Sequence, residues 1–264
     1  MRTAPLGDRE RFGLGAPVMT PPSRTTAPGK ASPGAGCEAA RERVAAAVEV
    51  LAQDGCVALP TETVWGLATS ARSPDAVAAL RNWKGRSDAQ PISVLVSGLP
   101  VLGGYGFEVD RLARKLMERF WPGPLTLVLP CRSTLAPGIA RADGAVGVRC
   151  SSHPVVAELV AAAEAAGLGP LTATSCNRSG ESPARDEAQA RALCAGRGGP
   201  HVLAPGSQDA GATAPTTVLD LAAEPPRILR EGRVSEAMLR PIIEEMREQS
   251  APGPTGPPTG ETTG

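Results

Sequence analysis

The stretch Asp110–Leu129, DRLARKLMERFWPGPLTLVL, decides the fold class of this 264-residue chain. Its first half places Leu112, Leu116 and Phe120 four residues apart, the spacing of one helical face. The WPGP at 121–124 ends that helix, because proline and glycine interrupt helical hydrogen bonding. The apolar run Leu125–Leu129 then predicts a buried strand. A helix, a tight break and a buried strand in succession indicate a layered α/β domain.

Helix and strand signals alternate on both sides of this stretch. The pattern predicts helices over Ala39–Gln53, Ser73–Trp83, Pro154–Ala166 and Ser235–Glu248, and strands over Cys56–Leu59, Ile92–Val96, Val146–Arg149, Leu171–Ala173, Thr217–Leu221 and Ile228–Leu229. We therefore expect one α/β domain over residues 37–250. Residues 1–36, with six Pro and six Gly, and the proline- and glycine-rich 251–264 are predicted to be disordered ends.

Composition excludes several classes of protein. The 27 basic and 27 acidic residues cancel, and only 3% of residues are aromatic, so neither a duplex-binding surface nor a base-stacking platform is indicated. The charge-free run from Gln90 to Phe107 is broken by prolines and glycines, so no membrane span is predicted. The six cysteines form no CxxC pair, which favours free, mostly buried thiols in a cytoplasmic protein and no metal site.

The common nucleotide and hydrolase motifs are absent from the sequence. It contains no GxxxxGK[ST], no GxGxxG after a strand and no GxSxG. The chemistry is therefore expected to depend on binding and charge, without a covalent triad.

Four polar segments follow predicted strands or helices, where open α/β sheets place ligands. They are Pro60–Leu67 (PTETVWGL), Lys84–Ser87 (KGRS), Thr172–Gly180 (TATSCNRSG) and the set Arg149, Thr216, Thr217 and Arg230. Lys84 stands out because the chain has 24 Arg but only three Lys, and Lys beside Arg86 suits a polyphosphate. The residues alone leave plainer alternatives open: a connecting turn for Pro60–Leu67, helix-dipole complementation for Lys84, a polar loop after Thr172, and a surface charge for Arg149.

Together these segments resemble the YrdC/Sua5 family of L-threonylcarbamoyladenylate synthases. The resemblance covers about residues 40–245, and the matching pieces occur in the family's order: PTETVWGL, KGRS with Pro91-Ile92, FWPGPLTLVL, VGVR with His153-Pro154, TSCNRSG, PTTVLD and ILREG. It implies a three-layer YrdC-like α/β domain around a twisted mixed sheet. The extra C-terminal domain of longer Sua5 proteins has no counterpart after the last predicted helix, which is typical of the short form.

This sequence departs from the family pattern at four uncharged positions. Trp65 stands where the family usually has Tyr or Phe, Cys176 replaces an alanine, Ser151 follows Cys150 where proline is common, and Thr216 replaces a serine. Because no charged group is lost, the resemblance still implies an active enzyme.

The resemblance implies a nucleotidyltransferase that combines L-threonine, bicarbonate or CO2, and ATP into threonylcarbamoyl-AMP and pyrophosphate. Thr61, Arg149 and Thr216 are expected to bind threonine, and Lys84 and Arg86 to act on the ATP phosphates. The nucleotide site is completed by Ser175, Asn177, Ser182 and Arg230. Mg²⁺ is expected on the phosphates without a carboxylate pair to hold it. A partner transferase complex would then modify adenosine 37 of tRNAs that read ANN codons.

Two other functions stay open at this stage. A carbamoyl-transfer enzyme could use the same fold, although the longer chain and zinc-finger-like cysteines of such proteins are lacking here. A non-catalytic RNA-binding module, or weak direct tRNA binding, would use the family's concave basic face, and the zero net charge argues against it.

Overall fold

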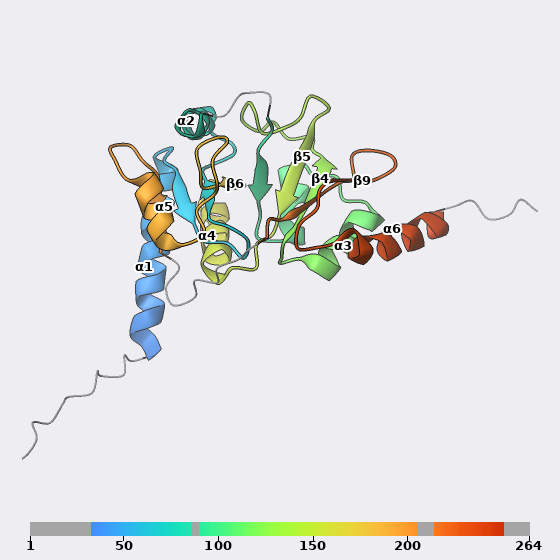
Figure 1. Cartoon of the computed structure of the whole chain (residues 1–264), viewed down its shortest axis with the longest axis horizontal. Helices are drawn as coiled ribbons and strands as arrows, with labels where there is room; N and C mark the ends of the chain where they lie inside the picture. The colour runs from blue at the N-terminus through green and yellow to red at the C-terminus, as the bar shows by residue number, and fades with distance from the viewer. Residues whose placement is uncertain (1–32, 86–89, 205–213, 251–264) are drawn as a thin grey trace, which may run out of the picture.

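The protein is described by a computed structural model over residues 33–85, 90–204 and 214–250. This part of the chain forms a nine-stranded mixed sheet with helices on both faces (Figure 1). The strands are β1 Val57–Leu59, β2 Gly66–Ala68, β3 Ser93–Leu95, β4 Leu125–Pro130, β5 Ala145–Arg149, β6 Leu171–Ser175, β7 His201–Val202, β8 Thr217–Asp220 and β9 Arg227–Arg230. Their order across the sheet is β7-β1-β2-β6-β3-β5-β4-β8-β9.

The described residues form six α-helices, and three of them begin at a capping side chain. The six helices are α1 Pro33–Ala52, α2 Pro74–Lys84, α3 Arg111–Phe120, α4 Pro154–Ala165, α5 Glu187–Cys194 and α6 Glu236–Ser250. The hydroxyl of Ser73 accepts the Ala76 N–H at the start of α2, and Asp110 does the same for Ala113 in α3. Gly85 ends α2 in the left-handed conformation at φ 64°, which glycine adopts without strain.

Alternation of side chains along the strands builds a separate core on each face. Val57 and Leu59 of β1 join the core beneath α1 and α4, whereas Ala58 points to the opposite core. That opposite core also receives residues of α2, α3, α5 and α6, including Leu80, Leu116 and Leu239. The result is the three-layer α/β arrangement that the sequence predicts. In Figure 1, α1 and α5 lie at one end of the sheet and α3 and α6 at the other.

The sequence misses three short elements. Strand β2 has three fully buried residues and β7 has two residues, so neither shows an alternating pattern. Helix α5 has eight residues, and the Asp186 carboxylate accepts the Gln189 N–H at its start. The elements that the sequence does predict are present, with ends that shift by a few residues.

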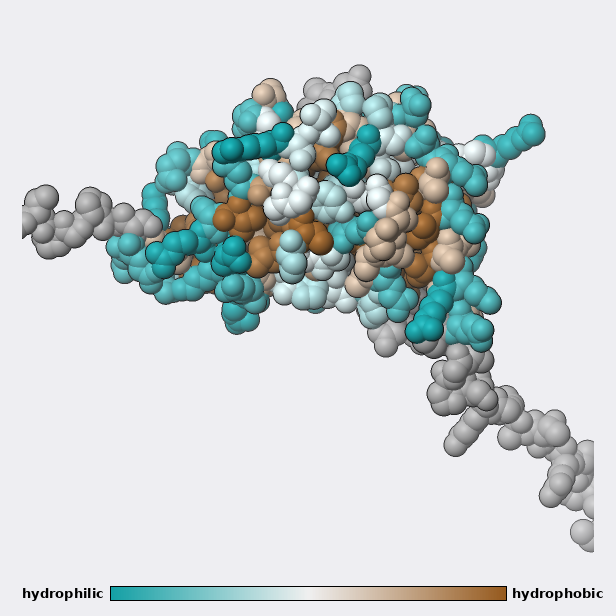
Figure 2. Space-filling model, turned by 180° about the vertical axis from the view of Figure 1, so that it is seen from behind, coloured by the Kyte–Doolittle hydropathy of each residue, from teal (hydrophilic) through white to brown (hydrophobic). Residues whose placement is uncertain are grey.

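The ends of the predicted domain differ slightly from expectation. Helix α1 begins at Pro33, six residues before the predicted start at Ala39 and inside the predicted N-terminal segment. Residues 1–32 and 251–264, for which we predict disorder, lie outside the described residues. No helix in the described part of the chain has the length and apolar character needed to span a membrane. From behind, the surface is mostly polar, with apolar residues gathered in patches (Figure 2).

Candidate active site

The sheet register places Arg149 and Ser175 on one face of the sheet but at opposite edges of it. Leu95 of β3 pairs with Arg149 of β5 on one side and with Leu171 of β6 on the other. Paired residues project to the same face, and Ser175 is four residues beyond Leu171, so its side chain also shares that face. Because β6 runs antiparallel to β3 and β3 parallel to β5, the C-terminal ends of β5 and β6 point to opposite edges.

Small residues form the part of this face between the two ends. Ser93, Gly147 and Ala173 come from the three adjacent strands β3, β5 and β6, and each is half-buried. A Cβ atom on Gly147 would lie 2.5 Å from the Ser93 Oγ, so only glycine fits there without a shift. We call these three residues the floor. Because all three residues are small and half-buried, this part of the sheet face is not fully covered by the rest of the protein.

At one end of the floor, Arg149 is buried, with a relative exposure of 8%. Its Nη1 donates to the Thr216 Oγ1 at 2.6 Å, and its Nη2 lies 2.8 Å from the Glu62 Oε1. The Thr63 hydroxyl lies 3.4 Å from both terminal nitrogens. The alternative that Arg149 is a surface charge is therefore wrong. Its Nε is buried and has no hydrogen-bond partner among the described residues.

Glu62 supplies the negative charge of this end. Its Oε2 accepts a hydrogen bond from the Ser151 hydroxyl at 2.6 Å, and its Oε1 accepts one from the Ser152 N–H at 3.2 Å. Burial alone would raise the pKa of Glu62, but the Arg149 charge and the Ser151 hydrogen bond hold it below its ordinary value. The carboxylate is therefore ionised at neutral pH.

Arg230 brings a second guanidinium to the same end. Its Nε donates to the Thr216 carbonyl oxygen at 2.9 Å, beside the Thr216 hydroxyl that Arg149 uses. Desolvation and the nearby Arg149 charge lower the pKa of Arg230. Both guanidinium groups thus contact Thr216, and Glu62 contacts one of them; two cations with one carboxylate suit an anionic ligand. We call Glu62, Thr63, Arg149, Thr216 and Arg230 the Arg149 cluster.

At the other end of the floor, Lys84 points into the protein. It is 3% exposed, and its Nζ donates to the carbonyl oxygens of Ser175 and Asn177 at 2.5 and 2.9 Å and to the Asn177 Oδ1 at 2.9 Å. The Ser175 hydroxyl also donates to the Asn177 Oδ1, at 2.6 Å. Lys84, Ser175 and Asn177 form what we call the Lys84 cluster. A lysine that only complemented the helix dipole would stay in solvent.

The segment 60–65 connects the two clusters. It leaves β1 at the Ser175 edge, and the Trp65 carbonyl accepts the Cys176 N–H at 2.8 Å. Between these points Glu62 and Thr63 contact Arg149, while the Thr61 hydroxyl donates to the Val64 carbonyl at 2.6 Å. Arg233 holds the Glu62 carbonyl oxygen at 2.8 Å. The plainer reading of this segment as a simple connecting turn does not account for these contacts.

The structure groups the predicted residues differently from the expected substrate pockets. Lys84, Ser175 and Asn177 come together as expected, and so do Arg149 and Thr216. Arg230, expected with the nucleotide residues, contacts Thr216 instead. Ser182 is exposed and lines a depression with α5 residues such as Leu193. Arg86 lies outside the described residues.

Sequence reasoning missed three residues of the site, which are Glu62, Ser151 and Arg233. Glu62 lies inside the PTETVWGL segment, between Thr61 and Thr63. An acidic residue between two threonines after a strand could have indicated that Glu62 belongs to the site. Nothing in the local sequence around Ser151 or Arg233 indicates their distant partner.

Two of the buried thiols flank the Lys84 cluster. Cys176, between Ser175 and Asn177, lies 3.9 Å from Cys194 at the end of α5, measured between the sulfur atoms. Burial and this contact raise the pKa of Cys176. The five cysteines with described side chains are free, and three of them are buried, as the sequence predicts.

A metal ion has no evident protein cage in the described ranges. No group of three or more His, Cys, Asp or Glu side chains comes close enough to hold one there. Glu62 already accepts three donors at the Arg149 cluster. Within the described residues, the acidic side chain of the site is thus occupied by protein donors.

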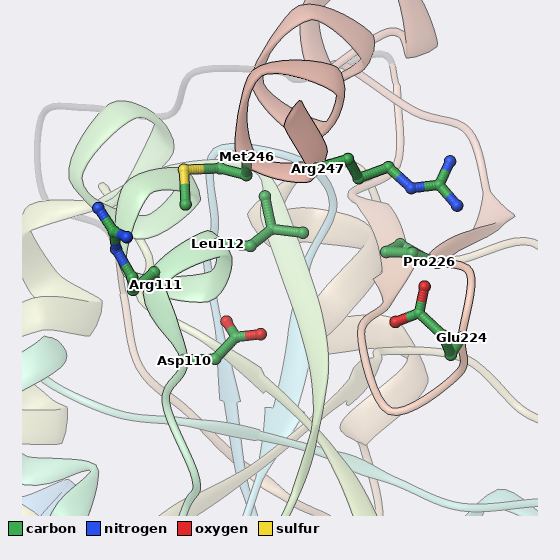
Figure 3. Close-up of a pocket in the computed structure, with 7 residues that line it drawn as sticks. All are labelled: Asp110, Arg111, Leu112, Glu224, Pro226, Met246 and Arg247. Atoms are coloured by element: carbon green, nitrogen blue, oxygen red, sulfur yellow. The ribbon is translucent and has the colours of Figure 1, made fainter. Parts of the chain in front are cut away.

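A depression between α3 and α6 contains none of the predicted site residues. It is lined by apolar and charged side chains (Figure 3): Asp110, Arg111, Leu112, Glu224, Pro226, Met246 and Arg247. In the close-up, its acids and arginines point to different sides of the opening. We find no set of convergent polar groups in it, and we place the candidate site on the floor and its two clusters.

Comparison with known proteins identifies relatives over most of the folded region. A family model described as "Telomere recombination" (Sua5/YciO/YrdC) matches residues 49–232. The threonylcarbamoyl-AMP synthase of Halorhodospira halophila is 36% identical over 149 residues, covering 56% of this chain and 76% of the relative. That of Bacillus subtilis is 34% identical over 206 residues, covering 76% of this chain and 56% of the relative.

A solved structure shares the fold at similar coverage. The crystal structure of P. abyssi Sua5 complexed with L-threonine superposes on this chain with a TM-score of 0.69, at 29% sequence identity. It covers 78% of this chain and 58% of the Sua5 chain. This chain therefore spans little more than half the length of the B. subtilis and P. abyssi proteins.

Proposed function

Because the chain belongs to the Sua5/YciO/YrdC family, we propose that it synthesises threonylcarbamoyl-AMP and pyrophosphate from L-threonine, bicarbonate or CO2, and ATP. It is an enzyme of the nucleotidyltransferase type. The synthase names of its relatives and the threonine complex of P. abyssi Sua5 support this activity. The observation that carries the proposal is the Arg149 cluster, where a nearly buried guanidinium is held between the Glu62 carboxylate and the Thr216 hydroxyl.

The threonine carboxylate binds at Arg149 in this proposal. The Arg149 guanidinium pairs with the carboxylate by charge-assisted hydrogen bonding in a site with little water. Thr216 and Thr63 already contact the guanidinium and form the wall of the pocket. Thr61 is expected at the opposite side, close to the amine or hydroxyl of threonine.

The reaction needs positioned reactants more than a reactive side chain. The uncharged amine of threonine attacks CO2 and loses a proton, giving a carbamate. A carbamate oxygen then attacks the α-phosphorus of ATP, the bond to the β-phosphate oxygen breaks, and pyrophosphate leaves. Because negative charge accumulates on the phosphate oxygens, fixed cations and N–H groups stabilise the transition state.

The nucleotide extends from the Arg149 cluster toward the Lys84 cluster. Arg230 lies beside Arg149 and can face the α-phosphate, where the carbamate must attack. Ser175, Asn177 and Ser182 are expected around the rest of the nucleotide, with Arg86 on the phosphates. Lys84 acts there by holding Ser175 and Asn177 and by its positive charge. Mg²⁺ arrives with ATP as part of the substrate, since the described residues form no cage for it.

The product is passed to a partner transferase complex that modifies adenosine 37 of tRNAs reading ANN codons. Cytoplasmic location and weak direct tRNA binding stay predictions.

The test is a reconstituted reaction with the purified chain. ATP, ¹⁴C-bicarbonate and threonine should together give pyrophosphate and a labelled threonylcarbamoyl-AMP, and omission of threonine should abolish both. Replacing threonine and bicarbonate by carbamoyl phosphate tests the carbamoyl-transfer alternative, for which pyrophosphate release would require no threonine. Filter binding of tRNA tests the RNA-binding alternative, and tight binding without any turnover would contradict the enzyme.

A further inference from the structure

We infer that Glu62 is a positioning residue that fixes the orientation of the Arg149 guanidinium in the proposed threonine pocket. This inference rests on the proposed function, because it explains how that site selects the carboxylate of an α-amino acid. Glu62 lies between two threonines of the segment 60–65, and its carboxylate contacts Arg149 directly at 2.8 Å.

Glu62 is itself held in place from three directions. Ser151 donates to one carboxylate oxygen and the Ser152 N–H to the other. Arg233 holds the backbone carbonyl of Glu62 at 2.8 Å. The carboxylate is 12% exposed, so water does not compete strongly for these contacts. A side chain fixed in this way can transmit its position to Arg149.

Two fixed nitrogens define the plane of the guanidinium. Thr216 accepts from Nη1 at 2.6 Å, and Glu62 pairs with Nη2 at 2.8 Å. Because the guanidinium is planar, holding both terminal nitrogens also sets the direction of the Nε–H bond. Nε is the remaining nitrogen, and it is buried without a partner among the described residues. The direction of that bond therefore depends on Glu62 as well as on Thr216.

Glu62 also sets the net charge that the ligand meets. Arg149 and Arg230 are close enough for the Arg149 charge to lower the pKa of Arg230. With Glu62 ionised, these three groups carry one net positive charge, which matches the single negative charge of a carboxylate. Without Glu62 they would carry two positive charges, which would favour a dianion such as phosphate.

The experiment compares Glu62→Gln with the wild-type chain in a binding titration with L-threonine alone. Gln keeps the size of the side chain and removes the charge. Because one charge-assisted contact that orients Arg149 is weakened, we expect the Kd for threonine to rise about tenfold. The KM for threonine should rise by a similar factor, while kcat at saturating threonine and the KM for ATP change less than about twofold.

Two further variants separate positioning from a general effect on folding. Glu164→Gln is the matched control, because that carboxylate also accepts a backbone N–H, from Ser97, but forms no ion pair with Arg149 in the described part of the chain. It should leave the threonine Kd unchanged. Ser151→Ala removes one hydrogen-bond donor to Glu62 and leaves Arg149 itself unchanged. We expect it to raise the threonine Kd about threefold. That result would support the inference even if Glu62→Gln folds poorly.

The outcomes distinguish this inference from the function on which it rests. If wild type binds threonine and both Glu62→Gln and Ser151→Ala bind it equally well, Glu62 does not position Arg149. If Glu62→Gln raises the KM values for threonine and ATP equally, its role is a general structural one and the inference is wrong. If the wild-type chain itself neither binds threonine nor releases pyrophosphate, the proposed function fails first.

Discussion

The two ends of the floor both contain a buried cation, but they use it in opposite ways. In the Arg149 cluster the cation contacts an ionised carboxylate and a hydroxyl, and its Nε remains without a partner among the described residues. In the Lys84 cluster the three donor positions of the ammonium meet three neutral oxygens of Ser175 and Asn177. The first arrangement holds the guanidinium by its terminal nitrogens and keeps its charge beside an ionised carboxylate. The second uses the hydrogen-bonding capacity of the ammonium to fix the loop that follows β6.

This difference indicates different roles for the two cations in the same reaction. Arg149 is proposed to recognise an anion directly, whereas Lys84 shapes the loop that would surround the nucleotide. Mutation of Arg149 should therefore affect one substrate selectively, and mutation of Lys84 should affect activity and folding together. The four predictions below test this distinction.

The largest effect is expected from Lys84→Ala. It leaves the oxygens of Ser175 and Asn177 without their shared donor and removes a charge near the phosphates. We expect turnover to fall about 30- to 1000-fold, equivalent to about 2–4 kcal/mol. Melting temperature should fall as well, although the sequence alone suggested an intact fold. Pyrophosphate release and thermal melting measure the two effects, and normal turnover at saturating ATP would remove Lys84 from the site.

Arg149→Lys should affect threonine much more than ATP. Lysine keeps the charge but loses the planar set of donors that Thr216 and Glu62 hold. Loss of one charged hydrogen bond, worth about 1.5–3 kcal/mol, should raise the KM for threonine about tenfold or more. Steady-state kinetics with each substrate varied in turn will measure the selectivity. An equal rise for both substrates would indicate a structural defect, and no rise would contradict the threonine pocket.

The acid dependence of stability should report the Glu62–Arg149 contact. The folded pKa of Glu62 is lowered, so its stabilising contribution is present above the unfolded value near 4.5 and is lost as pH falls through the lower folded value. Glu62→Gln should melt roughly 2–4 °C below wild type at pH 7, for a cost of about 1 kcal/mol. This difference in melting temperature should become smaller below about pH 4.5. Melting curves from pH 7 to pH 3 test it, and a difference that is independent of pH would show that the charge does not stabilise the fold.

The smallest effect is expected from Arg178→Ala at the rim of the Lys84 cluster. The Arg178 guanidinium lies 4.0 Å from the centre of the Trp83 ring, and the arginine is exposed. Such a contact contributes about 0.5–1 kcal/mol at exposed sites. We expect the melting temperature to fall by roughly 1–4 °C and the threonine KM to stay unchanged. A threonine KM raised as much as in Arg149→Lys would mean that the two ends of the floor are not separate.

The sequence predicts the layers of the fold well because long elements have strong periodic patterns. Helix α3 and strand β4 follow directly from the spacing of Leu112 and Leu116 and from the apolar run after Pro124. Strand β2 is too short to show an alternating pattern of hydrophobic residues. Its position therefore depends on pairing with β1 and β6. Local sequence does not contain that information.

The candidate site is predictable in its residues but not in their grouping. The polar segments identify Thr61, Lys84, Arg149 and Thr216 without any structure. They do not reveal that Lys84 points inward or that Arg230 joins Thr216, because these facts depend on strand direction. The Glu62–Ser151 contact joins residues 89 positions apart, and no spacing rule relates them.

The register between β6, β3 and β5 also fixes the length of any molecule that could contact both clusters. Arg149 and Ser175 are two strands apart, about 10 Å across the sheet, and four residues apart along it, about 13 Å. Their backbones are therefore about 16 Å apart on the diagonal. A free amino acid is too short to bridge that distance, whereas an amino acid joined to a nucleotide is long enough. Threonine can consequently contact one end alone, whereas the nucleotide and the joined product are long enough to reach toward both ends.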